Sequence, residues 1–273
     1  MLITKPDNEL AKCFKADGPY GLSENLFKGM IDFRFRFHQA TFSDAVLESV
    51  LDSIEGFKEK LRKYSCTLAQ QTKYTCTLYV VSEAGISVCD AGCSTAVQTI
   101  MMARKFPNST FFAFDVSSDA VRQASTRAQQ QGGVANLTFG VADGCDMPRD
   151  WSERFDVLVT WDVVHDVPHS SRFLREIRRV LKPGGMFLMI DINTKSDVAD
   201  NIGNDSAIGV YGYSLFHCLP TAMADKHSEG LGAAWGVEMQ KEYLQRTGFI
   251  STKQVYPRLD DTRSYFVSYN PTE

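Results

Sequence analysis

The chain has 273 residues, 44% of them hydrophobic, and a formal net charge of −4 that comes from interspersed signs. This composition supports a globular domain with a cap and excludes disorder over most of the chain. Because there is no long basic run, no signal peptide and no apolar stretch near the ~18 residues that span a bilayer, we expect a cytoplasmic protein that binds neither nucleic acid nor membrane.

The seven cysteines are an odd number at scattered positions, so they do not predict a disulfide framework. Cys89 and Cys93 lie close together, but the first falls in a predicted buried strand and the second in the turn that follows it. We therefore assign no metal site from the sequence.

The N-terminal part is expected to be a tail followed by a helical cap. Residues 1–21 are polar and weakly patterned, which predicts a tail. Residues 27–37 and 42–61 carry apolar side chains at helical spacing, which predicts helices that cover the carboxyl ends of the strands that follow. The alternative is plain core packing, which we expect for most of these residues. We divide the chain into a tail and cap at residues 1–80 and a main domain at residues 81–273.

The main domain alternates predicted strands and helices, which is typical of a Rossmann-like, doubly wound α/β sheet. Residues 193–236 interrupt this alternation with a segment that is too long for a simple connection, and we expect it to form the second part of a lid and to determine the substrate. The predicted strands are 87–89, 111–114, 137–141, 155–160, 186–190, 252–256 and 264–268, and the helices are 95–105, 118–131, 170–181 and 237–247.

The stretch Val88 to Ala96, V-C-D-A-G-C-S-T-A, joins a strand end at Asp90 to a tight turn of small residues at Gly92. Small residues let the backbone reverse into a helix and approach a ligand closely. Asp115 ends the next predicted strand, where a carboxylate can accept hydrogen bonds from ribose hydroxyls. Together these residues predict a nucleotide-cofactor site.

The glycine spacing separates two kinds of cofactor. A dinucleotide fingerprint requires G-x-G-x-x-G, so that a pyrophosphate can rest on the helix N-terminus. Here Ser94 and Val97 stand at the second and third glycine positions. This disfavours a nicotinamide-dependent dehydrogenase and favours S-adenosylmethionine, which has no phosphate.

The pattern around Asp90 resembles motif I of class I S-adenosylmethionine-dependent methyltransferases, although this class usually has glycine where Ser94 and Ala96 stand. G-V-A-D-G at 140–144, F-D-V-L-V-T at 155–160 and R-E-I-R-R-V-L-K-P-G-G-M-F-L-M-I-D at 175–191 resemble its later motifs. The resemblance implies a seven-stranded sheet whose last strand is antiparallel. It also implies that the cofactor is bound by Asp90, Gly92, Ser94, Asp115, Val116, Asp143, Gly144 and Trp161.

Residues 161–166, W-D-V-V-H-D, and 230–236, G-L-G-A-A-W-G, resemble a subgroup that usually carries an N-terminal winged-helix segment. We expect that segment to be truncated here. The subgroup often pairs subunits through it, so a homodimer stays open as the assembly state.

His165 and Asp166 follow the fourth predicted strand, where the methyl group is presented. His165 is a candidate base with Asp166 as its orienting partner, although Asp166 can instead cap a helix and His165 can be structural. His217 is a further candidate contact from the insertion. We therefore expect methyl transfer from S-adenosylmethionine to a small-molecule acceptor. The alternative is a catalytically degenerate protein of the same fold that binds the cofactor or a partner.

Overall fold

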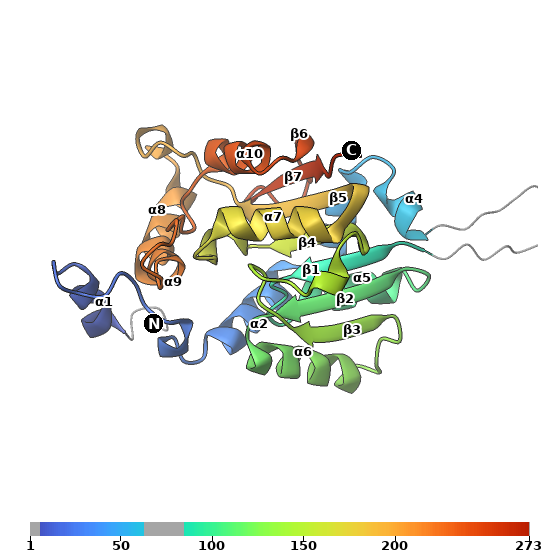
Figure 1. Ribbon diagram of the computed structural model, residues 1–273, viewed down its shortest axis with the longest axis horizontal. Coiled ribbons are helices and arrows are strands. Elements are labelled where there is room, and N and C mark those ends of the chain that lie inside the picture. The colour runs from blue at the N-terminus through green and yellow to red at the C-terminus, as the bar shows by residue number, and fades with distance from the viewer. Residues whose placement is uncertain (1–5, 63–84, 273) are drawn as a thin grey trace, which may run out of the picture.

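The computed structural model describes residues 6–62 and 85–272. Its centre is a seven-stranded sheet in the order β3-β2-β1-β4-β5-β7-β6 (Figure 1). The strands β1 to β5 pair in parallel, and β7 runs antiparallel between β5 and β6. The predicted doubly wound sheet with an antiparallel last strand is confirmed. The strands are β1 (Ser87–Ala91), β2 (Thr110–Asp115), β3 (Leu137–Val141), β4 (Phe155–Trp161), β5 (Leu181–Ile192), β6 (Ile250–Val255) and β7 (Arg263–Tyr269).

Helices cover both faces of the sheet. Along β5, Leu188 and Ile190 belong to one apolar cluster, while Phe187 and Met189 belong to another. Because successive side chains of a strand point to opposite faces, such a strand is buried on both sides. One face is covered by α3 (Asp44–Asp52), α4 (Phe57–Arg62), α5 (Val97–Lys105) and α6 (Ser118–Gln130), and the other by α7 (Ser170–Val180), α10 (Val237–Arg246) and the turn η3 (Arg149–Trp151).

The N-terminal helices differ in part from the predicted tail and cap. A short helix, α1 (Asp7–Cys13), forms within the predicted tail because Leu10 packs with Leu22 and Phe27. The turn η2 (Glu24–Leu26) and α2 (Met30–Thr41) follow it. The prediction that residues 42–61 cover the strand ends is wrong, since α3 and α4 pack into the apolar cluster on one sheet face. The predicted boundary at residues 80 and 81 lies outside the described residues.

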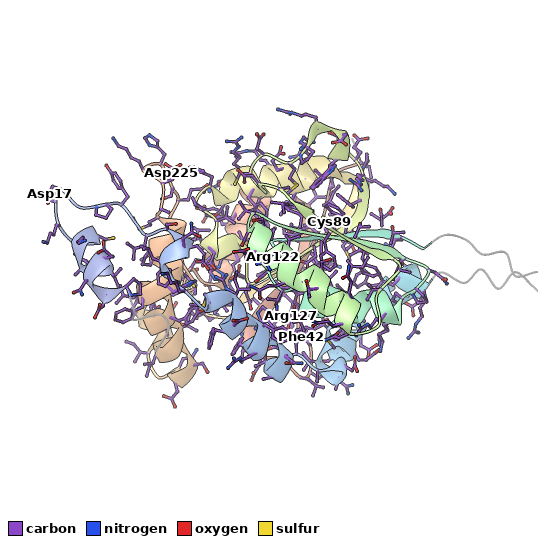
Figure 2. The ribbon with its side chains drawn as sticks, turned by 90° about the horizontal axis from the view of Figure 1, so that it is seen from below. Asp17, Phe42, Cys89, Arg122, Arg127 and Asp225 are labelled. Atoms are coloured by element: carbon purple, nitrogen blue, oxygen red, sulfur yellow. The ribbon has the colours of Figure 1, made fainter. Side chains whose placement is uncertain are left out.

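The insertion after β5 lies beyond the carboxyl ends of the parallel strands, where Figure 1 shows α8 and α9. The N-terminal helix α2 lies beside α6, as Figure 2 shows from below. There the Arg127 guanidinium lies 3.9 Å from the centre of the Phe35 ring and 3.3 Å from Asp32. None of the described helices has the length and apolar character needed to cross a membrane. The insertion contains η5 (Ala199–Asn201), α8 (Asp205–Tyr213), the π-helical turn η6 (Ser214–Cys218) and α9 (Leu219–Ala222).

Candidate cofactor and acceptor site

A cleft of about 2150 Å³ opens at the carboxyl ends of the parallel strands, between α2 and the insertion. Doubly wound sheets bind their ligands at this edge. Sites for one small molecule measure roughly 300–1,000 Å³, so this cleft has room for a cofactor and an acceptor together. The predicted site residues that line it are Gly92, Ser94, Asp115, Val116, Asp143, Gly144, Trp161, His165 and Asp166.

The turn after β1 has an unusual backbone. Gly92 has a φ of 77°, and a Cβ atom there would lie 2.6 Å from Cγ1 of Val163. Ser94 and Ala96 also have positive φ values, of 45° and 53°. The left-handed conformation that favours glycine is thus kept at two positions that carry side chains, at a cost of roughly 1–2 kcal/mol each.

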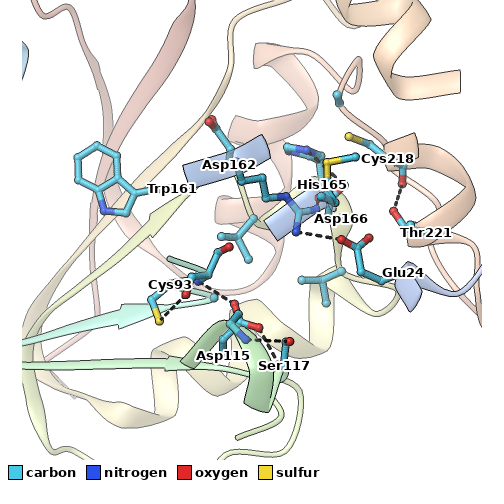
Figure 3. A pocket seen from close by; sticks show the side chains of 18 of the residues that line it. Glu24, Cys93, Asp115, Ser117, Trp161, Asp162, His165, Asp166, Cys218 and Thr221 are labelled. Atoms are coloured by element: carbon cyan, nitrogen blue, oxygen red, sulfur yellow. Dashed lines mark hydrogen bonds and ion pairs between the residues drawn. The ribbon is translucent and has the colours of Figure 1, made fainter. Parts of the chain in front are cut away.

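Asp115 joins this turn to the end of β2. Its Oδ2 accepts a hydrogen bond from the backbone N–H of Ser94, and its Oδ1 accepts one from the backbone N–H of Ser117, both at 2.8 Å (Figure 3). A carboxylate has about four lone-pair sites, so it can accept further hydrogen bonds from ribose hydroxyls in the cleft. The residues fit the ribose of S-adenosylmethionine.

Two further features fit a polar ligand. Among the described residues, the buried hydroxyl oxygens of Ser94 and Thr95 have no hydrogen-bond partner. Buried polar atoms are normally paired, so the hydroxyl of Ser94, which lines the cleft, is available to a bound molecule. At the end of β3, Oδ1 of Asp143 accepts a hydrogen bond from the N–H of Cys145 at 2.8 Å, which orients a carboxylate that lines the cleft.

Asp90 lies in β1, just before the turn, and is not among the residues that line the cleft. It is 1% exposed, and one of its oxygens accepts a hydrogen bond from the Thr99 hydroxyl. Burial raises the pKa of Asp90 to about 7. In this arrangement Asp90 joins the end of β1 to α5 through Thr99, and its predicted contact with the cofactor stays a prediction.

His165 lies in the turn η4 (Val164–Asp166) directly after β4, and its partner comes from β5. Its Nδ1 lies 2.7 Å from Oδ1 of Asp191, so it donates a hydrogen bond to this carboxylate, and both side chains are buried. The indole N–H of Trp235 donates to the same oxygen at 3.2 Å. Burial lowers the pKa of His165, but the charges of Asp191 and Asp166 outweigh it and raise the pKa well above its usual value.

Asp166 faces the other nitrogen of the same ring. Its Oδ1 lies 3.4 Å from Nε2 of His165, and its Oδ2 lies 3.6 Å from the Arg34 guanidinium (Figure 3). Arg34 also pairs with Glu24 at 3.0 Å. The predicted neighbours His165 and Asp166 therefore do face each other, although the residue that orients the imidazole by hydrogen bonding is Asp191.

His217 lies outside the cleft lining. It is fully buried, its ring centre lies 4.6 Å from that of Phe27, and its Nε2 lies 3.2 Å from Glu24. This placement gives His217 an indirect connection to the cleft through Glu24 and Arg34. Its predicted role as a substrate contact stays a prediction.

The cofactor side of the cleft also contains an ion pair that the sequence did not reveal. Trp161 packs against Phe42 with ring centres 4.8 Å apart, and the next residue, Asp162, accepts a hydrogen bond from Nε of Arg263 at 2.9 Å. Arg263 is brought there by β7. This contact could not be predicted from the spacing of residues in the sequence, because the two residues are 101 positions apart.

The family comparison matches residues 82–247 to a family described as "Methyltransferase domain". The "Fatty-acid O-methyltransferase" of Mycolicibacterium smegmatis is 29% identical over 142 residues, which cover 52% of this chain and 48% of the relative. The "Phthiotriol/phenolphthiotriol dimycocerosates methyltransferase" of Mycobacterium tuberculosis is 28% identical over 126 residues, which cover 46% and 45%. The chain thus spans about half the length of the curated relatives it matches.

Solved structures show the same fold at low identity. The CurJ carbon methyltransferase superposes with a TM-score of 0.65 at 15% identity, over 99% of this chain and 66% of that one. A putative O-methyltransferase from Nostoc punctiforme PCC 73102 also gives 0.65 at 15% identity, over 98% and 68%.

The sheet order and the cleft at the strand ends define a class I methyltransferase fold. The chain belongs to the methyltransferase domain family, and the cofactor of this class is S-adenosylmethionine. The resemblance found in the sequence motifs is confirmed.

Proposed function

We propose that this chain transfers a methyl group from S-adenosylmethionine to a small-molecule acceptor that loses a proton on methylation, such as a hydroxyl. One observation carries this proposal: the His165 and Asp166 side chains line the same cleft as the turn at Gly92, and Asp191 holds the imidazole in place. The cofactor supplies a methyl group that is already activated for displacement. The chain has to bind and orient the acceptor, exclude water and remove its proton.

The cofactor is held by the residues at the ends of β1, β2 and β3. Asp115 binds the ribose hydroxyls and Asp143 binds the adenine amino group, while the turn from Asp90 to Ala96 holds the methionine part. The open lone pairs of Asp115 and the hydroxyl of Ser94, which has no hydrogen-bond partner among the described residues, support this arrangement. Val116, Gly144 and Trp161 complete the lining of this end of the cleft.

The acceptor's proton passes to the carboxylate of Asp166, because the raised pKa of His165 keeps its imidazole protonated. Among the described residues, Oδ1 of Asp166 is buried without a hydrogen-bond partner, so it is free to accept one. Arg34 lies near the other oxygen of this carboxylate at 3.6 Å and keeps it oriented. A base positioned in this way contributes roughly 10²–10⁴-fold to a rate.

The acceptor is an apolar molecule. Phe33, Phe37 and Leu259 line the cleft although their side chains are 38%, 45% and 58% exposed. Exposed apolar side chains that gather at a cleft favour an apolar ligand. One of the two curated relatives named above has a fatty acid in its name, and the insertion at residues 193–236 selects the acceptor here.

Residues 81–273 form the methyltransferase domain, and the N-terminal segment is a truncated form of the winged-helix segment of the subgroup, through which a homodimer forms. The protein acts in the cytoplasm on a small molecule and has no nucleic-acid partner. The five described cysteines are all free, which supports a reducing compartment.

Calorimetric titration with S-adenosylmethionine and S-adenosylhomocysteine tests the cofactor site. Asp115→Asn should weaken binding at least ~10-fold, because hydrogen bonds to a charged group contribute about 1.5–3 kcal/mol. Asp200→Asn, in an exposed turn outside the cleft, is the matched control and should bind as the wild type does. Equal affinities of the two variants, or no binding by the wild-type chain, would overturn the proposal.

A further inference from the structure

Three side chains that can ligate a metal meet at the acceptor end of the cleft. They are His165 and Asp166 from η4 and Cys218 from η6, and one ligand atom of each lies within 4.8 Å of the others. All three line the cleft, and Figure 3 shows them close together. They approach one another only because the insertion folds back over the end of β4.

Two of these side chains are already oriented by second contacts. His165 donates its Nδ1–H to Asp191, so Nε2 is the nitrogen left to face Asp166. Asp166 places Oδ2 near Arg34 and leaves Oδ1 buried without a hydrogen-bond partner among the described residues. A metal-binding histidine almost always donates its other N–H to a carboxylate or carbonyl, and ligating carboxylates are held in a similar way.

The donor set favours zinc. It combines an imidazole nitrogen, a carboxylate oxygen and a thiol, and a thiolate selects Zn²⁺ over Mg²⁺ or Ca²⁺. The distance of 3.4 Å between Nε2 of His165 and Oδ1 of Asp166 suits two tetrahedral ligands of one ion, each at about 2.0–2.2 Å from it. The carboxylate and a thiolate would together balance the charge of the ion.

We propose that Zn²⁺ binds to Nε2 of His165, Oδ1 of Asp166 and the sulfur of Cys218, with its fourth position open to the cleft. Binding releases the thiol proton of Cys218, and any proton on Nε2, to the solvent. This inference rests on the proposed function, because zinc occupies Oδ1 of Asp166, the atom that would receive the acceptor's proton. Zinc and methyl transfer therefore compete for this end of the cleft.

The test is zinc binding to the full chain after treatment with a chelator, measured by competition with a chromophoric chelator. Cys218→Ser should weaken one zinc site at least ~10-fold, and Asp191→Asn should weaken the same site by about 10–100-fold through loss of the carboxylate that orients His165. Cys145→Ser is the matched control, because Cys145 also lines the cleft but is not a member of the three-residue cluster. Its zinc affinity should stay unchanged.

Co²⁺ gives a second readout that reports a bound thiolate. The wild type and Cys145→Ser should show a thiolate-to-cobalt charge-transfer band, and Cys218→Ser should lack it. Equal zinc affinity of Cys218→Ser and Cys145→Ser, or the same cobalt band in both, would overturn the proposal. Thermal unfolding of the metal-free variants checks that each is folded, and if Cys218→Ser is not, Cys218→Ala takes its place.

Titration with S-adenosylmethionine separates this inference from the proposed function. If the chain binds the cofactor but not zinc, the zinc proposal is overturned and the proposed function stands. If the chain binds neither, both proposals are overturned. If it is an active methyltransferase, zinc should lower its rate, and the loss should be smaller in Cys218→Ser; a rate that zinc leaves unchanged or raises would contradict the competition.

Discussion

The imidazole of His165 donates a hydrogen bond to the carboxylate of Asp191 across 2.7 Å, although the two residues lie 26 positions apart at the ends of neighbouring strands. Both side chains are buried, and Trp235 supplies a further donor to the same carboxylate oxygen. The end of β5 therefore fixes the orientation of a ring that β4 presents to the cleft.

Substitution of Asp191 tests this relationship. Asp191→Asn keeps the size of the side chain but removes the charge that holds His165, so we expect kcat to fall by about 10–100-fold, less than the roughly 10²–10⁴-fold that a general acid or base contributes. The KM for the cofactor should stay unchanged, because Asp191 lies away from the turn at Gly92. Steady-state kinetics with a cofactor titration measure both. Trp235→Phe, which removes one donor to the same oxygen, should have a smaller effect; a rise in KM alone would contradict the assignment.

Replacement of Gly92 tests the close packing of the turn. In Gly92→Ala the new Cβ atom would lie 2.6 Å from Cγ1 of Val163, and φ is 77°. We expect a loss of roughly 2–4 kcal/mol in the free energy of unfolding, from the left-handed backbone and overpacking together. Gly203→Ala is the matched control, because φ is 84° and no heavy atom lies within 4 Å of the added Cβ.

Denaturant unfolding of both variants separates the two contributions, since Gly203→Ala should lose only the backbone part. Adding Val163→Ala to Gly92→Ala should restore part of the difference. Equal losses in the two single variants would show that Val163 does not restrict this position.

Ser94 tests the strain in the motif. Its φ is 45°, and its hydroxyl has no hydrogen-bond partner among the described residues. Ser94→Gly should raise the free energy of unfolding of the cofactor-free protein by about 0.5–1 kcal/mol, because relief of the left-handed backbone exceeds the entropic cost of glycine. Ser125→Gly, within α6, should instead lower it by a similar amount. Denaturant unfolding measures both, and destabilisation by Ser94→Gly would contradict the strain.

Asp90 makes the stability of the cofactor-free protein depend on pH. Its pKa is raised from an ordinary value of 3.8 to about 7 by burial. The unfolded chain therefore loses this proton first as the pH rises, and the free energy of unfolding should fall by a few kcal/mol from about pH 4 to pH 7. Asp90→Asn should remove this part of the decline. Urea unfolding across this range checks it, and parallel curves for the two proteins would disprove the shift.

Local patterns predicted the sheet and several of the residues that line the cleft. Alternating apolar runs gave the strands, and the rule that parallel strands present their carboxyl ends at one edge brought Gly92, Asp115 and Asp143 together. The same rule applied to Asp191, which ends β5, could have found the partner of His165. The residues around Asp166 could not be found in this way, because Glu24 and Arg34 come from a cap with no motif.

The sequence by itself determined the class of fold, the seven strands implied by its motifs and the carboxylates at three strand ends, because strand periodicity and tight turns are local properties of the chain. Only the tertiary structure decided the order of the strands, the choice between lid and core for α3 and α4, the burial of His217 beside Phe27, and the meeting of Arg34, Asp166 and Cys218 at one end of the cleft. Those contacts join segments that are far apart in the chain. They depend on how the cap and the insertion pack against the strand ends, and no spacing of residues encodes that packing.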